Sequence, residues 1–147
     1  MRCEVRSVLS IPSEHAWQLL IERSCLVKVC LPLVRFEFLG ELKPEKLWIQ
    51  GQMVRCNCFI FGFLPTGTRE LFFERIDAKK MEIQTREKDP LIKKWDHLMA
   101  IKDLGQGKSS ISDSIEIDAG AMTFVVWLWA QWLYRHRHRR WKNYVAL

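Results

Sequence analysis

The chain has 147 residues and a formal net charge of +6, with 48% hydrophobic and 27% charged residues. This length and composition are typical of a single domain over residues 1–147 with its own core, and they exclude an intrinsically disordered protein. The positive excess is local, because residues 135–142 hold five cations and no acidic residue follows Asp118. A basic surface spread over the whole protein is therefore excluded.

The first third of the chain predicts a strand and two short helices. Residues 2–9 alternate loosely between apolar and polar side chains, as a strand does. The segment Ser10-Ile-Pro-Ser-Glu is typical of a helix start, and Ser24 can cap a second helix that Pro32 ends. The pattern is less regular from there to Lys46, although residues 36–38 are compatible with a short strand.

From about residue 47 to residue 118 the sequence alternates with a period of two, which predicts an antiparallel meander of six strands. The turns are marked by Leu64-Pro-Thr-Gly67 and by Gly105-Gln-Gly107, the second of which is typical of a hairpin. The predicted strands are 47–49, 53–63, 69–77, 81–87, 95–104 and 109–118.

The last element is one long helix that Ala119 and Gly120 open and that reaches about Asn143. At about 100° per residue, one group of largely apolar side chains shares the face that we expect to point inwards. The opposite face of the first three turns is apolar too, which indicates a second contact surface. The expected inward side chains are Met122, Val125, Val126, Trp129, Leu133 and His136.

This order of elements is an α+β pattern in which a curved sheet would wrap around the last helix. The order also carries a family resemblance, together with the features Ser-Glu-His-Ala-Trp17, Phe61-Gly-Phe-Leu-Pro65, Trp95-Asp-His97, Ser112-Asp113 and Ala119-Gly120. Over nearly its whole length the chain resembles the Bet v 1/START-like (SRPBCC) superfamily of helix-grip proteins.

The resemblance implies a cavity between sheet and helix that binds apolar or amphipathic small molecules such as lipids, sterols or polyketides. Some members of the superfamily are cyclases or dehydratases, whereas many only bind and carry their ligand. No catalytic motif is common to the superfamily, so no catalytic residue is carried over.

The last hairpin predicts one specific polar pair. If Gly105-Gln-Gly107 is its turn, His97 lies opposite Ile115 and Met99 lies opposite Asp113, so one histidine and one aspartate point inwards, diagonal to each other. A charge in an apolar layer needs a partner, and an aspartate would orient the imidazole and raise its basicity. The pair is a structural hydrogen bond, a polar anchor for a ligand, or a general base in a cyclase-type enzyme.

We expect an aromatic and aliphatic wall around the ligand, with His97 and Asp113 as its polar anchors. The choice of face is open for the strand 53–63, because its two faces are both apolar. The expected wall consists of Phe59, Phe61, Phe73, Ile83, Trp95, Met99, Met122, Val126 and Trp129.

The run from Arg135 to Lys142 is the strongest local charge signal. Cations at the end of a helix complement its macrodipole, which is the simplest explanation. The alternatives are an anionic membrane surface and, least favoured, nucleic acid. Together with the apolar outer face of the helix, this leaves a homodimer or a weak membrane contact open. The expected anion-binding residues are Arg137, Arg139 and Arg140.

No metal and no cofactor is expected. The four histidines form no His-Glu-x-x-His pattern, no Gly-x-Ser-x-Gly elbow occurs, and Cys56-x-Cys58 has no matching Cys/His pair. Five cysteines and an N-terminus without an apolar signal region predict free thiols and a cytoplasmic protein. The apolar run Ala121–Leu133 is shorter than the roughly 20 residues of a spanning helix.

Overall fold

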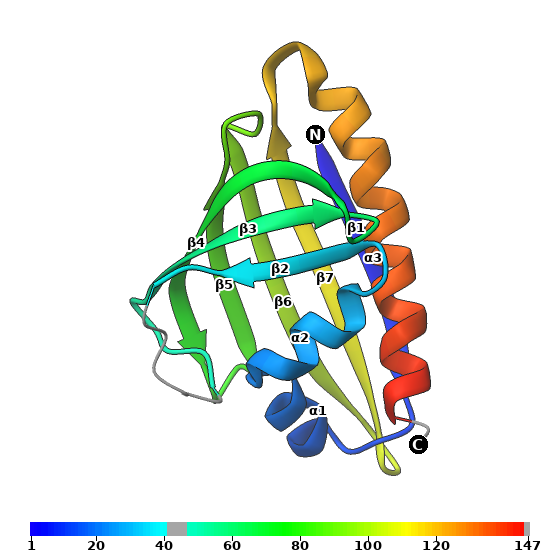
Figure 1. The fold of residues 1–147 in the computed structure, drawn as a ribbon. Helices are drawn as coiled ribbons and strands as arrows, with labels where there is room; N and C mark the ends of the chain where they lie inside the picture. The colour runs from blue at the N-terminus through cyan, green and yellow to red at the C-terminus, as the bar shows by residue number, and fades with distance from the viewer. Residues whose placement is uncertain (41–46, 146–147) are drawn as a thin grey trace.

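The elements follow the predicted order of a strand, two short helices, a meander and one long helix. The computed structural model describes residues 1–40 and 47–145 (Figure 1). In chain order the elements are β1 (Arg2–Leu9), α1 (Ser13–Leu20), α2 (Arg23–Cys30), β2 (Val34–Phe38), β3 (Met53–Ile60), β4 (Leu64–Asp77), β5 (Glu82–Lys88), β6 (Lys94–Gly105), β7 (Lys108–Asp118), the 3-10 turn η1 (Gly120–Met122) and α3 (Thr123–Val145).

The strands form one curved antiparallel sheet that wraps around α3 (Figure 1). Within the described residues the sheet has seven strands in the order β1-β7-β6-β5-β4-β3-β2. The strands from β2 to β7 each pair with their neighbour in the chain, and β1 pairs with β7 at the far edge. The predicted α+β helix-grip architecture is therefore confirmed.

The first strand of the meander differs from the prediction. Residues 47–49 were expected to be this strand, but Leu47 forms only an isolated bridge with Glu22. The meander still has six strands, because it begins with β2. The irregular connection expected up to Lys46 lies partly outside the described residues, which omit 41–46.

The turn between β3 and β4 also lies earlier than predicted. The chain turns at residues 61–63, where Phe61 and Gly62 have φ angles of 57° and 84°, and residues 64–67 already belong to β4. Proline is tolerated in this part of β4 because β5 pairs with β4 only from Glu70 onwards, so that one edge of the strand is free at Pro65.

The last hairpin has the predicted register. His97 on β6 lies opposite Ile115 on β7, and Met99 lies opposite Asp113. This register places His97 and Asp113 on the same inward face, where both are buried. The period of two and the position of the turn are thus sufficient to determine this part of the sheet.

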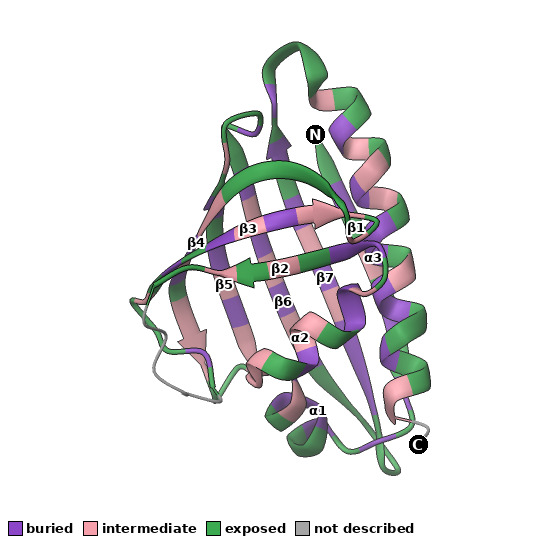
Figure 2. Ribbon diagram, in the orientation of Figure 1, coloured by how far each residue is buried: buried purple, intermediate pink, exposed green. Residues whose placement is uncertain are grey.

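The inward face of α3 is partly the predicted one, because Val126 and Leu133 are buried as expected. Met122 and Val125 are exposed, and His136 is only half-buried. The buried positions, visible along α3 in Figure 2, follow three- and four-residue steps and include polar side chains: Val126, Ala130, Leu133, Tyr134, Arg137, His138 and Trp141. Apolar character alone did not separate the covered positions from the exposed ones, because the start of this helix is apolar nearly all round.

None of the helices in the described ranges combines the length and the apolar character needed to cross a bilayer.

Candidate functional site

A cavity of about 300 Å³ lies between the inner face of the sheet and α3. Its wall is contributed by the five strands β2 to β6, by α2, by the loop that follows β5, and by α3 with the turn before it. Most of the wall is apolar, and the polar side chains in it come from β4, β5, β6, α3 and the loop that follows β5. Seven of the predicted ligand-binding residues line this cavity: Phe73, Trp95, His97, Met99, Met122, Val126 and Trp129.

Phe59 and Phe61 lie outside the wall. β3 turns Cys58 and Ile60 towards the cavity instead. The ring of Phe59 is covered by the guanidinium of Arg35, at 4.1 Å from the ring centroid, and Phe61 lies in the turn and packs edge-on against Trp129, with 6.0 Å between ring centroids. Both faces of β3 carry apolar side chains, so the alternation alone does not tell which face lines the cavity.

Ile83 and Asp113 are fully buried behind the wall rather than in it. Asp113 acts on the cavity through His97, because Nε2 of His97 donates a 2.6 Å hydrogen bond to Oδ1 of Asp113. The other carboxylate oxygen, Oδ2, accepts a 2.7 Å hydrogen bond from Nε2 of His138. Nδ1 of His138 lies 2.8 Å from the hydroxyl oxygen of Ser7 on β1.

The charge states within this network follow from its contacts. Burial alone would raise the pKa of Asp113, but the nearby charge of Arg137 and the hydrogen bonds from His138 and His97 hold this pKa well below its ordinary value of 3.8. Burial would likewise lower the pKa of His97, but the hydrogen bond and the charge of Asp113 raise it above 6.5. An ionised Asp113 beside a readily protonated His97 is the result.

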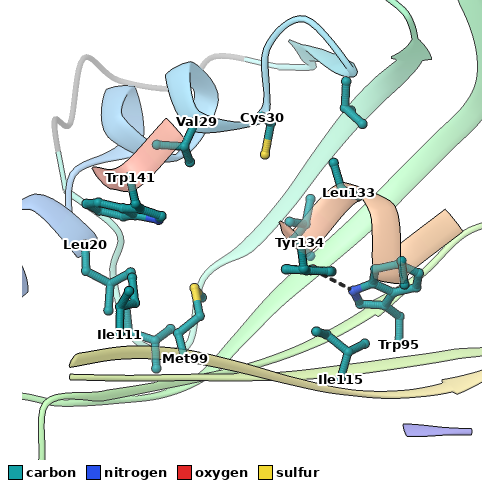
Figure 3. Close-up of a cluster of buried hydrophobic side chains, with 14 of the residues drawn as sticks. Leu20, Val29, Cys30, Trp95, Met99, Ile111, Ile115, Leu133, Tyr134 and Trp141 are labelled. Carbon is teal, nitrogen blue, oxygen red and sulfur yellow. Dashed lines mark hydrogen bonds between the residues drawn. The ribbon is translucent and has the colours of Figure 1, made fainter. Parts of the chain in front are cut away.

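The free side of the His97 ring faces further polar groups. Nδ1 of His97 lies 3.4 Å from the hydroxyl oxygen of Tyr134 and 3.6 Å from Oε2 of Glu87. The Tyr134 hydroxyl also accepts a 3.3 Å hydrogen bond from Nε1 of Trp95, drawn as a dashed line in Figure 3. His97 is therefore held in place from both sides of its ring.

A second buried cluster, which the sequence did not single out, joins β4 and β5. Nε of Arg69 donates a 3.1 Å hydrogen bond to Oε1 of Glu87, and Nη1 of Arg69 donates a 3.2 Å hydrogen bond to Oδ2 of Asp89. The hydroxyl of Thr85 donates a 2.7 Å hydrogen bond to Oε2 of Glu87. Burial alone would raise the pKa of Glu87, but Arg69 and His97 lower it to about 2.

The signal for this second cluster was present in the sequence. Glu87 continues the alternation of Ile83 and Thr85 on the inward face of β5, so a carboxylate at that position needs a buried cation as partner. The partner could not be read from the sequence because Arg69 lies on another strand.

The three predicted anion-binding arginines are separated by the structure. Arg139 and Arg140 are exposed, and Nη2 of Arg140 donates a 3.3 Å hydrogen bond to the carbonyl oxygen of Lys28. Arg137 is only 3% exposed and lines the cavity. The expectation of a basic surface at this helix end therefore does not extend to Arg137.

In residues 1–40 and 47–145, no group of three His, Cys, Asp or Glu side chains is placed to hold a metal ion. The five cysteines are free and buried, which confirms the predicted free thiols. The sulfur atoms of Cys56 and Cys58 lie 3.9 Å apart.

Solved structures with the same architecture place the fold in a known class. The Zhui aromatase/cyclase from Streptomyces sp. R1128 has a TM-score of 0.75 at 13% identity, covering 99% of this chain and 93% of that one. A START superfamily protein from Mycobacterium smegmatis has a TM-score of 0.71 at 12% identity, covering 99% and 97%. Norcoclaurine synthase from Thalictrum flavum, in complex with dopamine and hydroxybenzaldehyde, has a TM-score of 0.71 at 11% identity, covering 99% and 86%.

At these identities the likeness concerns the fold, which is that of the Bet v 1/START-like (SRPBCC) superfamily. The family is more particular: the model described as "Domain of unknown function (DUF8410)" matches residues 7–145, and the chain belongs to this family. No curated protein matches the sequence.

Proposed function

We propose that this protein binds a small apolar or amphipathic molecule in the cavity between the sheet and α3. The observation that carries the proposal is an apolar cavity of about 300 Å³ with buried ionisable groups in its wall. Ligand pockets are typically about 300–1,000 Å³ and combine an apolar lining with a few polar groups. A role in ligand binding also agrees with the START superfamily and aromatase/cyclase structures that share the fold.

The volume restricts the size of the ligand. The cavity of about 300 Å³ lies at the lower end of the volumes typical of ligand pockets. A small ligand is therefore favoured, such as a medium-chain lipid or a small aromatic molecule.

The cavity opens beside the start of α3. Three of its lining residues are about half exposed: Leu91 at 52%, Met122 at 44% and Val125 at 54%. Their side chains surround the way in, so an apolar molecule that enters would exchange contacts with water for contacts with these side chains.

Native mass spectrometry of the protein as purified tests the proposal, since a bound small molecule adds its mass to that of the chain. Titration with fatty acids and aromatic compounds, followed by the fluorescence of Trp95 and Trp129 in the wall, is the second measurement. The absence of both a co-purified mass and a fluorescence response to any of these compounds would rule out a binding role.

A cyclase- or dehydratase-type reaction is the second candidate function. It is favoured by one observation, the imidazole of His97 in the cavity wall with Asp113 at 2.6 Å from Nε2. A histidine oriented by a carboxylate transfers protons readily near neutral pH. In His97→Ala, turnover of a candidate substrate should be lost while ligand binding persists, and unchanged turnover would reject His97 as the proton-transfer group.

A contact with an anionic membrane is proposed for the outer side of α3. An exposed apolar stripe, formed by Phe124, Val125, Leu128 and Trp132, continues along the same side into the exposed cations Arg135 and Arg139. Aromatic side chains beside cations suit the interface of a bilayer that contains anionic lipids. Val125 belongs to the stripe and to the cavity wall, so such a contact would bring the opening of the cavity to the membrane.

Co-sedimentation with phosphatidylcholine vesicles, with and without phosphatidylglycerol, tests the membrane contact. Binding that increases with the anionic lipid supports it. A dimer in gel filtration, together with no vesicle binding, would assign the stripe to a second copy of the chain instead.

A further inference from the structure

We infer that the ligand of this cavity carries a single acidic group, such as a carboxylate, and that the guanidinium of Arg137 binds it. The inference rests on the proposed binding function and adds the chemical class of the ligand. It excludes a purely hydrocarbon ligand or a neutral alcohol as the preferred occupant.

Arg137 is a buried cation with unused donors. Its side chain lines the cavity and is 3% exposed. Its Nε and Nη2 atoms have no hydrogen-bond partner in the described part of the chain. A guanidinium has five N–H donors, and leaving them unsatisfied away from water is costly, so an acceptor is expected at this position.

The nearby carboxylates do not supply this acceptor. Asp113 exerts the strongest favourable charge effect on Arg137, but no ion pair within 4.0 Å joins them among the described residues. The two oxygens of Asp113 already accept hydrogen bonds from His97 and His138. Glu87 is held by Arg69 and by Thr85.

Arg69, the other arginine in the wall, is a cation whose hydrogen-bond donors have acceptors. Arg69 donates hydrogen bonds to Glu87 and Asp89, and its guanidinium lies over the Trp95 ring at 4.6 Å from the centroid. An incoming anion would compete with two carboxylates at Arg69. At Arg137 it would meet free donors, so the two arginines of the wall are not equivalent.

The ring of Tyr134 positions the free guanidinium. The central carbon of the Arg137 guanidinium lies 4.8 Å from the centroid of this ring, one helical turn earlier on α3. A cation–π contact of this kind uses the face of the guanidinium and leaves its in-plane N–H groups to other acceptors. A carboxylate is the acceptor whose geometry matches two such N–H groups at once.

The position of Arg137 defines an amphipathic ligand. The remaining wall is largely apolar, with Leu133 and Val126 towards the start of the same helix. An acid with a hydrocarbon or aromatic body could place its carboxylate at Arg137 and its body along this apolar wall. A medium-chain fatty acid or a bicyclic aromatic acid meets both requirements and the volume.

The test compares decanoate with decanol, which share the same chain and differ in charge. Calorimetric titration at pH 7 should give the acid the higher affinity for the full-length protein by roughly 10- to 100-fold, the range for hydrogen bonds to charged groups. Arg137→Met should remove most of this difference by weakening decanoate and leaving decanol unchanged. The matched control is Arg139→Met, which changes an exposed arginine on the same helix and should leave both affinities as they are.

The outcomes are distinguishable. If decanol binds the wild-type protein as tightly as decanoate, the inference is overturned while the binding function stands. If neither compound binds, and no other small molecule does, the proposed function fails. The ratio of the decanoate and decanol affinities is measured on the wild-type protein and does not depend on any variant. If Arg137→Met does not fold, Arg137→Gln replaces it. If the Arg137→Met and Arg137→Gln proteins still prefer decanoate to decanol, the carboxylate binds elsewhere and the role of Arg137 is contradicted.

Discussion

Asp113 on β7 and His138 on α3 are joined by a 2.7 Å hydrogen bond although they lie 25 residues apart in the chain. The bond ties the long helix to the sheet, and the same carboxylate also receives a 2.6 Å hydrogen bond from His97 in the cavity wall. Asp113 is fully buried, so its charge depends on these partners. One side chain therefore connects the packing of the helix to the polar part of the cavity.

Replacing Asp113 should destabilise the fold strongly. Asp113→Ala leaves His97 and His138 without their acceptor in the interior, and breaking a buried charged network typically costs about 3–5 kcal/mol. Urea denaturation measures the free energy of unfolding. Glu116→Ala, at an exposed position of the same strand, is the control and should cost less than about 1 kcal/mol. Equal effects of the two substitutions would show that the network contributes nothing.

Acid should weaken the fold through Glu87. The pKa of Glu87 is lowered from 4.5 to about 2 in the folded protein, so its contribution is complete above about pH 4.5 and is lost as the pH falls towards 2. At about 1.4 kcal/mol per pKa unit, this loss is on the order of 3 kcal/mol.

Urea midpoints between pH 6 and pH 2.5 measure this acid dependence. Glu87→Gln should flatten the decline relative to the wild type, whereas Glu14→Gln, at an exposed position on α1, should not alter it. A variant at position 87 that keeps the full acid dependence would contradict the assigned pairing with Arg69.

Filling the cavity should abolish ligand binding without unfolding the protein. Val126 lies in the wall on α3, and Val126→Trp would place an indole in the empty volume. Larger side chains in a filled core typically cost about 1–3 kcal/mol, whereas here the free energy of unfolding should change by less than about 1 kcal/mol. Val8→Trp, at an exposed position of β1, should leave binding intact. Continued binding by the Val126→Trp protein would locate the ligand outside this cavity.

The apolar stripe on α3 should be required for vesicle binding. The double substitution Leu128→Ser and Trp132→Ser removes two exposed apolar side chains, and co-sedimentation with anionic vesicles should fall at least several-fold. Leu104→Ser serves as the control, because Leu104 is equally exposed but lies by the β6–β7 turn, at the other end of the molecule from the start of α3 (Figure 1). A similar decrease in the control would mean that the contact is not specific to α3.

The meander and the His97–Asp113 pair could be predicted because they depend on local patterns. Strict alternation assigns each residue of β6 and β7 to a face, and Gly105-Gln-Gly107 sets the register between the strands. These two facts place an imidazole and a carboxylate on the same inward face. The pairing follows without any knowledge of the rest of the fold.

The wall contributed by β3 could not be predicted in this way. Cys58 and Ile60 face the cavity, while Phe59 and Phe61 do not line it. An alternation in which both faces are apolar has two equivalent solutions, and the choice depends on which neighbouring elements cover each face.

Arg137 shows the same limit on α3. The spacing of the expected inward stripe pointed to Arg140, but Arg139 and Arg140 are exposed and the buried side chain is that of Arg137. Its burial follows from the rotation of the helix against the sheet, which the hydrogen bonds of His138 to Asp113 and Ser7 help to hold.

The sequence by itself thus determined the α+β order, the meander, the last hairpin with its polar pair, and the resemblance to the superfamily. Only the tertiary structure decided which face of β3 lines the cavity, that Arg69 pairs with Glu87 and Asp89, and that Arg137 is a buried cation with free donors. The physical reason is the separation along the chain of the residues that interact. Alternation and turns are properties of neighbouring residues, whereas the partners of a buried charge come from strands and helices that are distant in the chain.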